Sequence, residues 1–366
     1  MSNHPPAQPD QPRLIWDIGT AYDFFASLDV LHNPDEYGLR ASWAAGVRSR
    51  LPVAERKLLE DVQSFIWVPL HWIYNLPAPK DVASALWSLR QTLPAERLMA
   101  LNSSSEMEDF TAVYRSVAER RAWDKDDVEA IRELLNREKK DKKHAAQFLK
   151  VLPKYLDWWT RPEEFGELYL SALQSFYQVF FAEEEKRIAP YLQEALDRAQ
   201  ELAAQLEFPD LLAELSQGVH FGGDFDTPEL ILAPAYWSTP LVLWGKVSPD
   251  STLFLYGGRP ADATLIPGEA IPEAVLRALK ALADPTRLQI LRYLNEEQLT
   301  PAELSRRLRL RAPTVIHHLS ALRLAGLVHL IMDNDGEKRY AARLGAVPGI
   351  FSSLGKYLQI VEKIEQ

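Results

Sequence analysis

A short stretch near the C-terminal end of the sequence carries four arginines within six residues, namely Arg306, Arg307, Arg309 and Arg311. A guanidinium group binds phosphate through parallel hydrogen bonds, so arginines gathered on one surface suit contact with a nucleic-acid backbone. Further along the chain, residues 338–339 add a second basic pair, Lys338 and Arg339. An arginine run taken alone is often only a solvated surface. The neighbouring segments must therefore decide between the two interpretations.

Three helix signals surround these arginines. Asp284, followed by proline, has the pattern of a helix start. Thr300 and Glu303 have the spacing of a capping box, again with proline just inside the helix. A third helix is expected over residues 311–325. The side chains expected to face inward are Leu288, Ile290, Leu291 and Leu294 in the first helix, Leu304 and Leu308 in the second, and Val315, Leu319 and Leu322 in the third.

The third helix also has an outer face with chemistry of its own. At about 100° per residue, Pro313, His317 and Ser320 lie opposite the apolar stripe, with Thr314 and Ile316 on the flanks. His317 and Thr314 can exchange hydrogen bonds with base edges, while Ile316 and Pro313 can touch thymine methyl groups. We interpret this face as a surface for the major groove. The alternative is an ordinary solvated helix face.

A β-hairpin is expected after this helix. An apolar run over residues 327–332 precedes a turn at 333–336, and a second strand is expected over residues 337–341. Helix, helix, helix and hairpin in this order form a winged helix-turn-helix. Acidic residues at the hairpin tip disfavour a deep approach to phosphate; they are Asp333, Asp335 and Glu337.

Together these motifs resemble the DNA-binding core of ArsR-type transcriptional regulators. The resemblance covers residues 273–345 and is carried by A-L-A-D-P-T-R-L-Q-I-L, then P-A-E-L-S-R-R-L, then P-T-V-I-H-H-L-S-A-L-R-L-A-G-L-V. It implies a homodimer that binds double-stranded DNA, more often a repressor than an activator. The family usually has polar Gln and Ser where Ala312, Pro313 and Ile316 stand. We therefore expect less direct readout of base edges and more specificity from DNA shape.

Charge is distributed unevenly along the 366 residues, which carry a net charge of −10. Residues 271–346 contain 12 Lys/Arg and 8 Asp/Glu, giving +4, so the remainder carries −14. A basic module on an acidic body is expected when only one part approaches phosphate. The absence of cysteine excludes disulfides and thiolate metal sites and favours a reducing cytoplasm. We see neither a signal peptide nor an apolar run long enough to span a bilayer.

The expected fold class is mainly α with a small antiparallel β part. We predict a large helical N-terminal domain, with helical periodicity beginning at Arg13, followed by the winged helix-turn-helix. The predicted parts are a tail at 1–12, a helical domain at 13–218, a small β-rich segment with its connector at 219–270, the DNA-binding domain at 271–346 and a C-terminal helix at 347–366. The β-rich segment is assigned to the N-terminal domain. The C-terminal helix either forms a dimer contact or docks onto that domain.

Within the helical domain, aromatic and apolar residues recur with helical spacing between Phe165 and Phe180, and Pro190 is expected to restart a helix. Two interpretations of the domain remain open. One is an effector-binding pocket for an unidentified small molecule, lined by Trp67, Trp158, Trp159 and Phe176. The other is a dimerisation scaffold whose aromatic residues form only a core.

No metal, cofactor or catalytic residue is expected. Metal-sensing relatives use cysteine pairs or His and Asp on the terminal helix, and this chain has neither over 350–366. We interpret His220, Asp224 and Asp226 as part of a glycine-rich turn. The nucleotide, zinc-peptidase and serine-hydrolase motifs are absent from the sequence. Alternatives to a regulator are a protein-interaction module built on a winged helix, or an enzyme with an unrecognised site in the helical domain.

Overall fold

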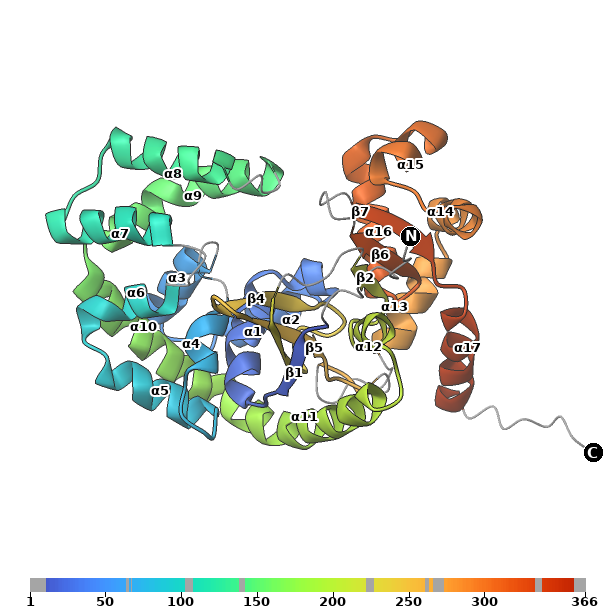
Figure 1. Ribbon diagram of the computed structural model, residues 1–366, viewed down its shortest axis with the longest axis horizontal. Helices are drawn as coiled ribbons and strands as arrows, with labels where there is room; N and C mark the ends of the chain where they lie inside the picture. The colour runs from blue at the N-terminus through green and yellow to red at the C-terminus, as the bar shows by residue number, and fades with distance from the viewer. Residues whose placement is uncertain are drawn as a thin grey trace, which may run out of the picture.

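The computed structural model describes residues 11–63, 66, 68–102, 108–137, 142–221, 227–260, 263–265, 273–332 and 338–358. Figure 1 shows a helical N-terminal body around a sheet, with a smaller group of helices and strands at the C-terminal end. The expected fold class, mainly helical with a small β part, is confirmed. Within the described residues, no helix has both the length and the apolarity needed to cross a membrane.

The N-terminal body is mostly helical, although its first element is a strand. Helical periodicity was expected from Arg13 onward, and this is wrong for the first four residues because they form an edge strand of the sheet. The elements in order are β1 (Arg13–Trp16), α1 (Thr20–His32), a 3-10 helix (Pro34–Tyr37), α2 (Ala41–Arg48), α3 (Val53–Val62), α4 (Leu70–Tyr74), α5 (Val82–Gln91), α6 (Pro94–Asn102), α7 (Glu108–Arg120), α8 (Lys125–Arg137), α9 (Lys142–Trp159), α10 (Pro162–Phe176), a π-helical turn (Tyr177–Phe181), α11 (Ala182–Ala203) and α12 (Phe208–Leu215).

Helix α11 corrects the expected restart at Pro190. The proline lies inside the 22-residue helix, which continues on both sides of it. Proline in a helix interior costs about 3 kcal/mol through a lost hydrogen bond and a steric clash. Ile188 and Leu192 flank it and are buried in the main core, so tertiary packing offsets this cost.

The main sheet has the strand order β1-β3-β5-β4, with β3 at Glu229–Ala235, β4 at Leu243–Ser248 and β5 at Ser251–Gly257. Strands β1, β3 and β5 run parallel, and only β4 pairs antiparallel with its neighbour β5. The expected antiparallel arrangement of the three strands after residue 218 is therefore wrong for β3 with β5 and right for β4 with β5. Strand β5 lies between β3 and β4, so consecutive strands β3 and β4 are not neighbours.

Burial on both faces explains the parallel arrangement. On one face, Ile231 and Leu253 enter the main core with the N-terminal helices. On the other face, Leu230 and Phe254 form a second cluster with residues of α11 and α12. Uninterrupted apolar runs are typical of parallel strands covered by helices on both sides, whereas alternating patterns are typical of a sheet with one wet face.

The C-terminal module is a winged helix. It comprises α13 (Glu273–Leu282), α14 (Pro285–Glu296), α15 (Pro301–Leu308), α16 (Ala312–Leu324), β6 (Val328–Met332), β7 (Lys338–Ala342) and α17 (Ala346–Tyr357). Its core contains the expected inward residues of all three central helices with one exception. Leu288 is 49% exposed. It lies roughly 115° around α14 from the direction shared by Ile290, Leu291 and Leu294, so it sits on the flank of the helix.

One short strand joins the two parts of the molecule. Strand β2 (Val219–Phe221) follows α12 of the body, yet it pairs in parallel with β6 of the wing. The second sheet therefore has the order β2-β6-β7. The segment 219–270, expected to belong with the N-terminal domain, contributes β3 to β5 to the body and β2 to the wing sheet.

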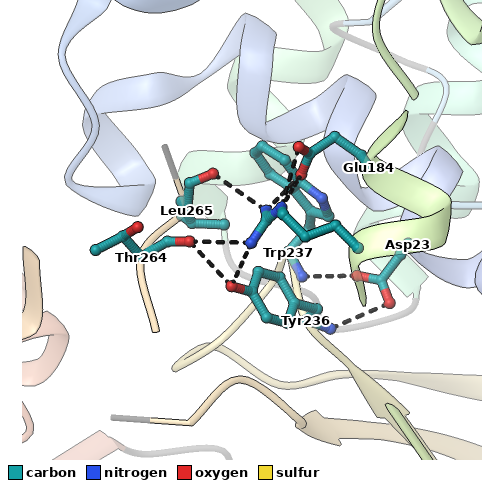
Figure 2. Close-up of polar contacts among 7 residues, drawn as sticks. Asp23, Glu184, Tyr236, Trp237, Thr264 and Leu265 are labelled. Atoms are coloured by element: carbon teal, nitrogen blue, oxygen red, sulfur yellow. Dashed lines mark hydrogen bonds and ion pairs between the residues drawn. The ribbon is translucent and has the colours of Figure 1, made fainter. Parts of the chain in front are cut away.

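A buried carboxylate fixes the end of β3 to α1. Figure 2 shows Asp23 facing the backbone that follows the strand. The carboxylate accepts hydrogen bonds from the backbone N–H groups of Tyr236, at 3.1 Å, and Trp237, at 2.6 Å. Burial raises the pKa of Asp23 to about 7, and the two backbone hydrogen bonds lower it only in part. The side chain thus holds the end of β3, although burial of its ionised form near neutral pH is unfavourable.

A neighbouring guanidinium ties the connector after β5 to α11. Arg187 forms an ion pair with Glu184 and donates to the hydroxyl of Tyr236 at 2.8 Å (Figure 2). It also donates to the carbonyls of Thr264 and Leu265, both at 3.3 Å. These contacts secure the stretch of chain that leads towards the C-terminal module.

We expect Asp23→Asn to flatten part of the pH dependence of stability. Because the pKa of Asp23 is raised in the folded state to about 7, its protonation favours folding. That contribution is present at low pH and is lost as pH rises through about 7, by at most roughly 1.4 kcal/mol per pH unit. Denaturant unfolding at pH 5.5 and 7.5 measures it. The free energy of unfolding of the wild type minus that of the variant should be smaller at pH 7.5 than at pH 5.5. An equal difference at both pH values would contradict this account.

Candidate DNA-binding surface

Helix α15 begins with the capping box that the sequence predicts. The side chain of Thr300 accepts from the backbone of Glu303 at 3.2 Å, and the Glu303 carboxylate accepts from the backbone of Thr300 at 2.7 Å. These reciprocal bonds satisfy two N–H groups that the helix start would otherwise leave unpaired. Arg309 ends the helix in a left-handed conformation, φ 55°. The resulting tight turn brings α16 against α15.

Helix α16 presents the outer face expected from its periodicity. Val315, Leu319 and Leu322 are buried in the module core, as predicted. On the opposite side Ile316 is 40% exposed. Every residue predicted to face the major groove is exposed, namely Pro313, Thr314, Ile316, His317 and Ser320. His318, which follows His317, is half-buried, and this burial lowers its pKa. The helix therefore offers one wet face with both polar and apolar groups.

The basic side chains beside α16 differ in their surroundings. Arg306, Arg309 and Arg311 are exposed. Arg307 is also exposed, but it forms an ion pair with Glu297 at 2.6 Å. Its hydrogen bond lowers the pKa of the Glu297 carboxyl, so this acidic group stays ionised opposite it. Phosphate binding by Arg307 must therefore compete with an internal carboxylate.

The wing contributes fewer exposed cations than the turn. Lys338 is exposed at the start of β7, whereas Arg339 is half-buried and lies 3.7 Å from the Glu303 carboxylate. The tip residues, including Asp333, Asp335, Gly336 and Glu337, lie outside the described residues. Strand β7 is also joined to the loop before α15 by paired backbone hydrogen bonds between Leu299 and Tyr340. The wing base is thus fixed to the helix-turn-helix.

Residues 284–329 match a family model described as "Bacterial regulatory protein, arsR family". The C-terminal module contains an ArsR-type helix-turn-helix. The ArsR-type match includes α14, α15 and α16 and reaches β6, so the exposed outer face of α16 lies within it. This assignment points to a DNA-binding transcription regulator rather than an enzyme. Searches of curated proteins and of solved structures returned no match.

The aromatic residues expected to line an effector pocket lie in separate ring clusters. Trp159 stacks on Tyr114, with ring centroids 5.0 Å apart. Trp158 packs edge-on against Phe165 at 5.7 Å. Phe176, in α10, instead packs on Phe24, Phe180 and Phe181. Trp67 lies outside the described residues.

The turn assigned to His220, Asp224 and Asp226 is described only at His220, because Asp224 and Asp226 lie outside the described residues. His220 lies in β2, where its ring meets His329 of β6. Within the described chain, no group of three or more His, Asp or Glu side chains is arranged to hold a metal ion.

Two features of the ArsR-type module escaped the sequence interpretation. The ion pair between Arg307 and Glu297 joins α15 to the segment before it. The two residues are ten apart in sequence, and no local sequence pattern predicts their contact. Arg323 is 7% exposed, although arginine is seldom buried. Arg323 lies four residues after Leu319, on the inward stripe of α16, and this position indicates that its side chain is buried.

Releasing Arg307 should strengthen sequence-independent binding to duplex DNA. We expect Glu297→Gln to raise that affinity roughly two- to fivefold at low salt, because an exposed ion pair of this size no longer competes with phosphate. Fluorescence anisotropy with a labelled duplex measures the change. Glu296→Gln makes the same charge change at the neighbouring exposed position. Equal effects of the two variants would show that the ion pair does not restrain Arg307.

Proposed function

We propose that this protein is a dimeric transcriptional repressor whose ArsR-type module binds operator DNA and whose N-terminal body receives the controlling signal. The observation that carries the proposal is the exposed outer face of α16 beside four exposed arginines, of which Arg307 is paired with Glu297. Phosphate contacts by the arginines would set the register on the duplex, and the helix face would meet the base edges. DNA shape would supply further specificity, since Pro313 and Ile316 form few hydrogen bonds with bases.

The proposed dimer uses the apolar surface of α17. Its inner side packs against α13, and Val347 and Ile350 join the winged-helix core. Its outer side leaves Phe351 55% exposed and Leu358 53% exposed. In Figure 1 this helix lies at the edge of the winged helix that is turned away from the N-terminal helices. A second copy covering this face would bury the apolar surface and leave α16 accessible in each protomer.

The N-terminal body is proposed to be the regulatory part. It is acidic, so it contributes no favourable phosphate contact of its own. A small-molecule effector that binds one arrangement of the dimer more tightly would shift the population towards that arrangement and change operator affinity. Trp159 and Phe176 are tightly packed, which favours an effector-binding site in another part of the body.

Replacing both Arg306 and Arg307 by Ala should weaken binding to all duplex sequences alike. The slope of log affinity against log salt should fall by roughly 1 to 2, because each lost phosphate contact removes about 0.9. A salt series with specific and unrelated duplexes measures both effects. Arg292→Ala removes an exposed arginine from α14 and serves as the control. A slope that stays flat in the wild type would instead favour a protein-interaction module.

Charge placed in the proposed dimer contact should separate the protomers. We expect Phe351→Glu to halve the mass measured by light scattering, because a desolvated carboxylate opposes burial of the α17 surface. Ser352→Glu introduces the same group at the adjacent exposed position and should be tolerated better. A wild-type protein that remains monomeric at micromolar concentration would rule out this contact as a stable dimer interface.

A further inference from the structure

The wing is attached to the N-terminal body through β2. Phe221 at the end of this strand packs against Trp244 and Phe254 of the body sheet, with ring centroids 5.7 and 5.8 Å apart. On its other side the strand pairs with β6, and the backbone N–H of Leu330 donates to the carbonyl of Gly218 at 3.0 Å. The strand is therefore held by the body and shared with the wing.

A buried arginine reinforces the same junction. Arg323 of α16 donates to the carbonyls of Ser216 and Gln217, both at 3.1 Å. These carbonyls follow the last turn of α12, where the helix end carries partial negative charge. Burial lowers the pKa of Arg323 to about 10, and the side chain stays charged at neutral pH. The inner face of α16 is thus fixed directly to the body.

Two histidines meet where β2 joins β6. His220 Nε2 and His329 Nδ1 are 3.2 Å apart, and their ring centroids are 4.8 Å apart. His329 is closely packed, since a Cβ on Gly218 would come within 2.8 Å of its Nδ1, whereas the side chain of His220 is exposed. One N–H fits between the two nitrogens, so the contact requires one donor and one acceptor.

The charges around this pair oppose its full protonation. Burial lowers the pKa of His329, and the positive fields of His220, Arg343 and Arg323 lower it further, while the backbone of Gly218 raises it in part. Arg323 stays charged at neutral pH, and burial raises the pKa of Tyr340 beside it, so that hydroxyl is neutral there. If both imidazoles were protonated, two N–H groups would face each other next to two guanidinium groups.

We propose that His220 and His329 form a proton-sensitive latch that holds β2 against the wing and opens when both rings are protonated. The latch is closed above the ordinary histidine pKa of about 6.5 and loses stability as pH falls below that value, because the open state binds the additional proton. Opening frees β6 from the body while Phe221 keeps β2 on the body sheet. The winged helix then keeps the Arg323 contact with the body but loses the strand pairing between β2 and β6.

Hydrogen–deuterium exchange of the full-length protein tests the latch. After correction for intrinsic rates, exchange of the β6 amides, including Leu330, should rise between pH 7.5 and 5.5 by up to about tenfold per pH unit below 6.5. His329→Gln should abolish this rise, because the neutral amide still offers a hydrogen-bond partner and gains no charge. His220→Gln should behave alike, and His71→Gln in α4 is the control. Circular dichroism at both pH values establishes that each variant is folded.

Exchange of β6 that is independent of pH in the wild type would overturn the proposal. So would a rise that persists in His329→Gln, or greater protection in acid, as occurs when a carboxylate stabilises the protonated pair. The exchange readout requires no DNA, so the latch does not depend on the proposed function. A pH-dependent β6 in a protein that binds no duplex would uphold the latch and refute the regulator.

Discussion

Burial of one side of α16 is the constraint on which the functional surface depends. Val315, Leu319 and Leu322 fill the core of the winged helix, and this fixes the rotation of the helix about its axis. The opposite side is then committed to solvent, together with His317 and the flanking Thr314 and Ile316. A large-to-small change in such a core typically costs 2 to 5 kcal/mol, so the orientation is strongly enforced. The chemistry offered to a major groove follows from this packing.

The chain has two parts that differ in net charge. The basic module carries +4 and the remaining residues carry −14. Inside the module, Glu297 and Glu303 already lie against Arg307 and Arg339. The cations most available to phosphate are therefore those on and after the turn between α15 and α16. In the proposed complex, most of the phosphate contact would therefore lie beside α16 and less of it on the wing.

The sequence predicted the winged helix well because its signals are local. The capping box at Thr300, the apolar stripe of α16 and the turn after it each depend on residues within one or two helical turns. The sheet of the body was predicted less well, since its parallel pairing joins strands far apart in sequence, such as Arg13 with Glu229. Periodicity reports which faces are apolar, but it does not report which distant strand covers them.

The same limit applies to the link between body and wing. Strand β2 is three residues long, and its partner β6 begins more than a hundred residues later. The inward arginine of α16 had a positional signal, but its acceptors just after α12 had none. These long-range contacts make the DNA-binding module part of one assembly with the body. The body is thus joined directly to α16.

A map of binding sites across the genome, followed by footprinting at the strongest sites, tests the central claim most directly. The account predicts discrete sites with two similar half-sites roughly one helical turn apart, each protected along the major groove. These sites should disappear when the arginines beside α16 are replaced. A map without discrete sites, or protection that does not depend on α16 and its arginines, would contradict it.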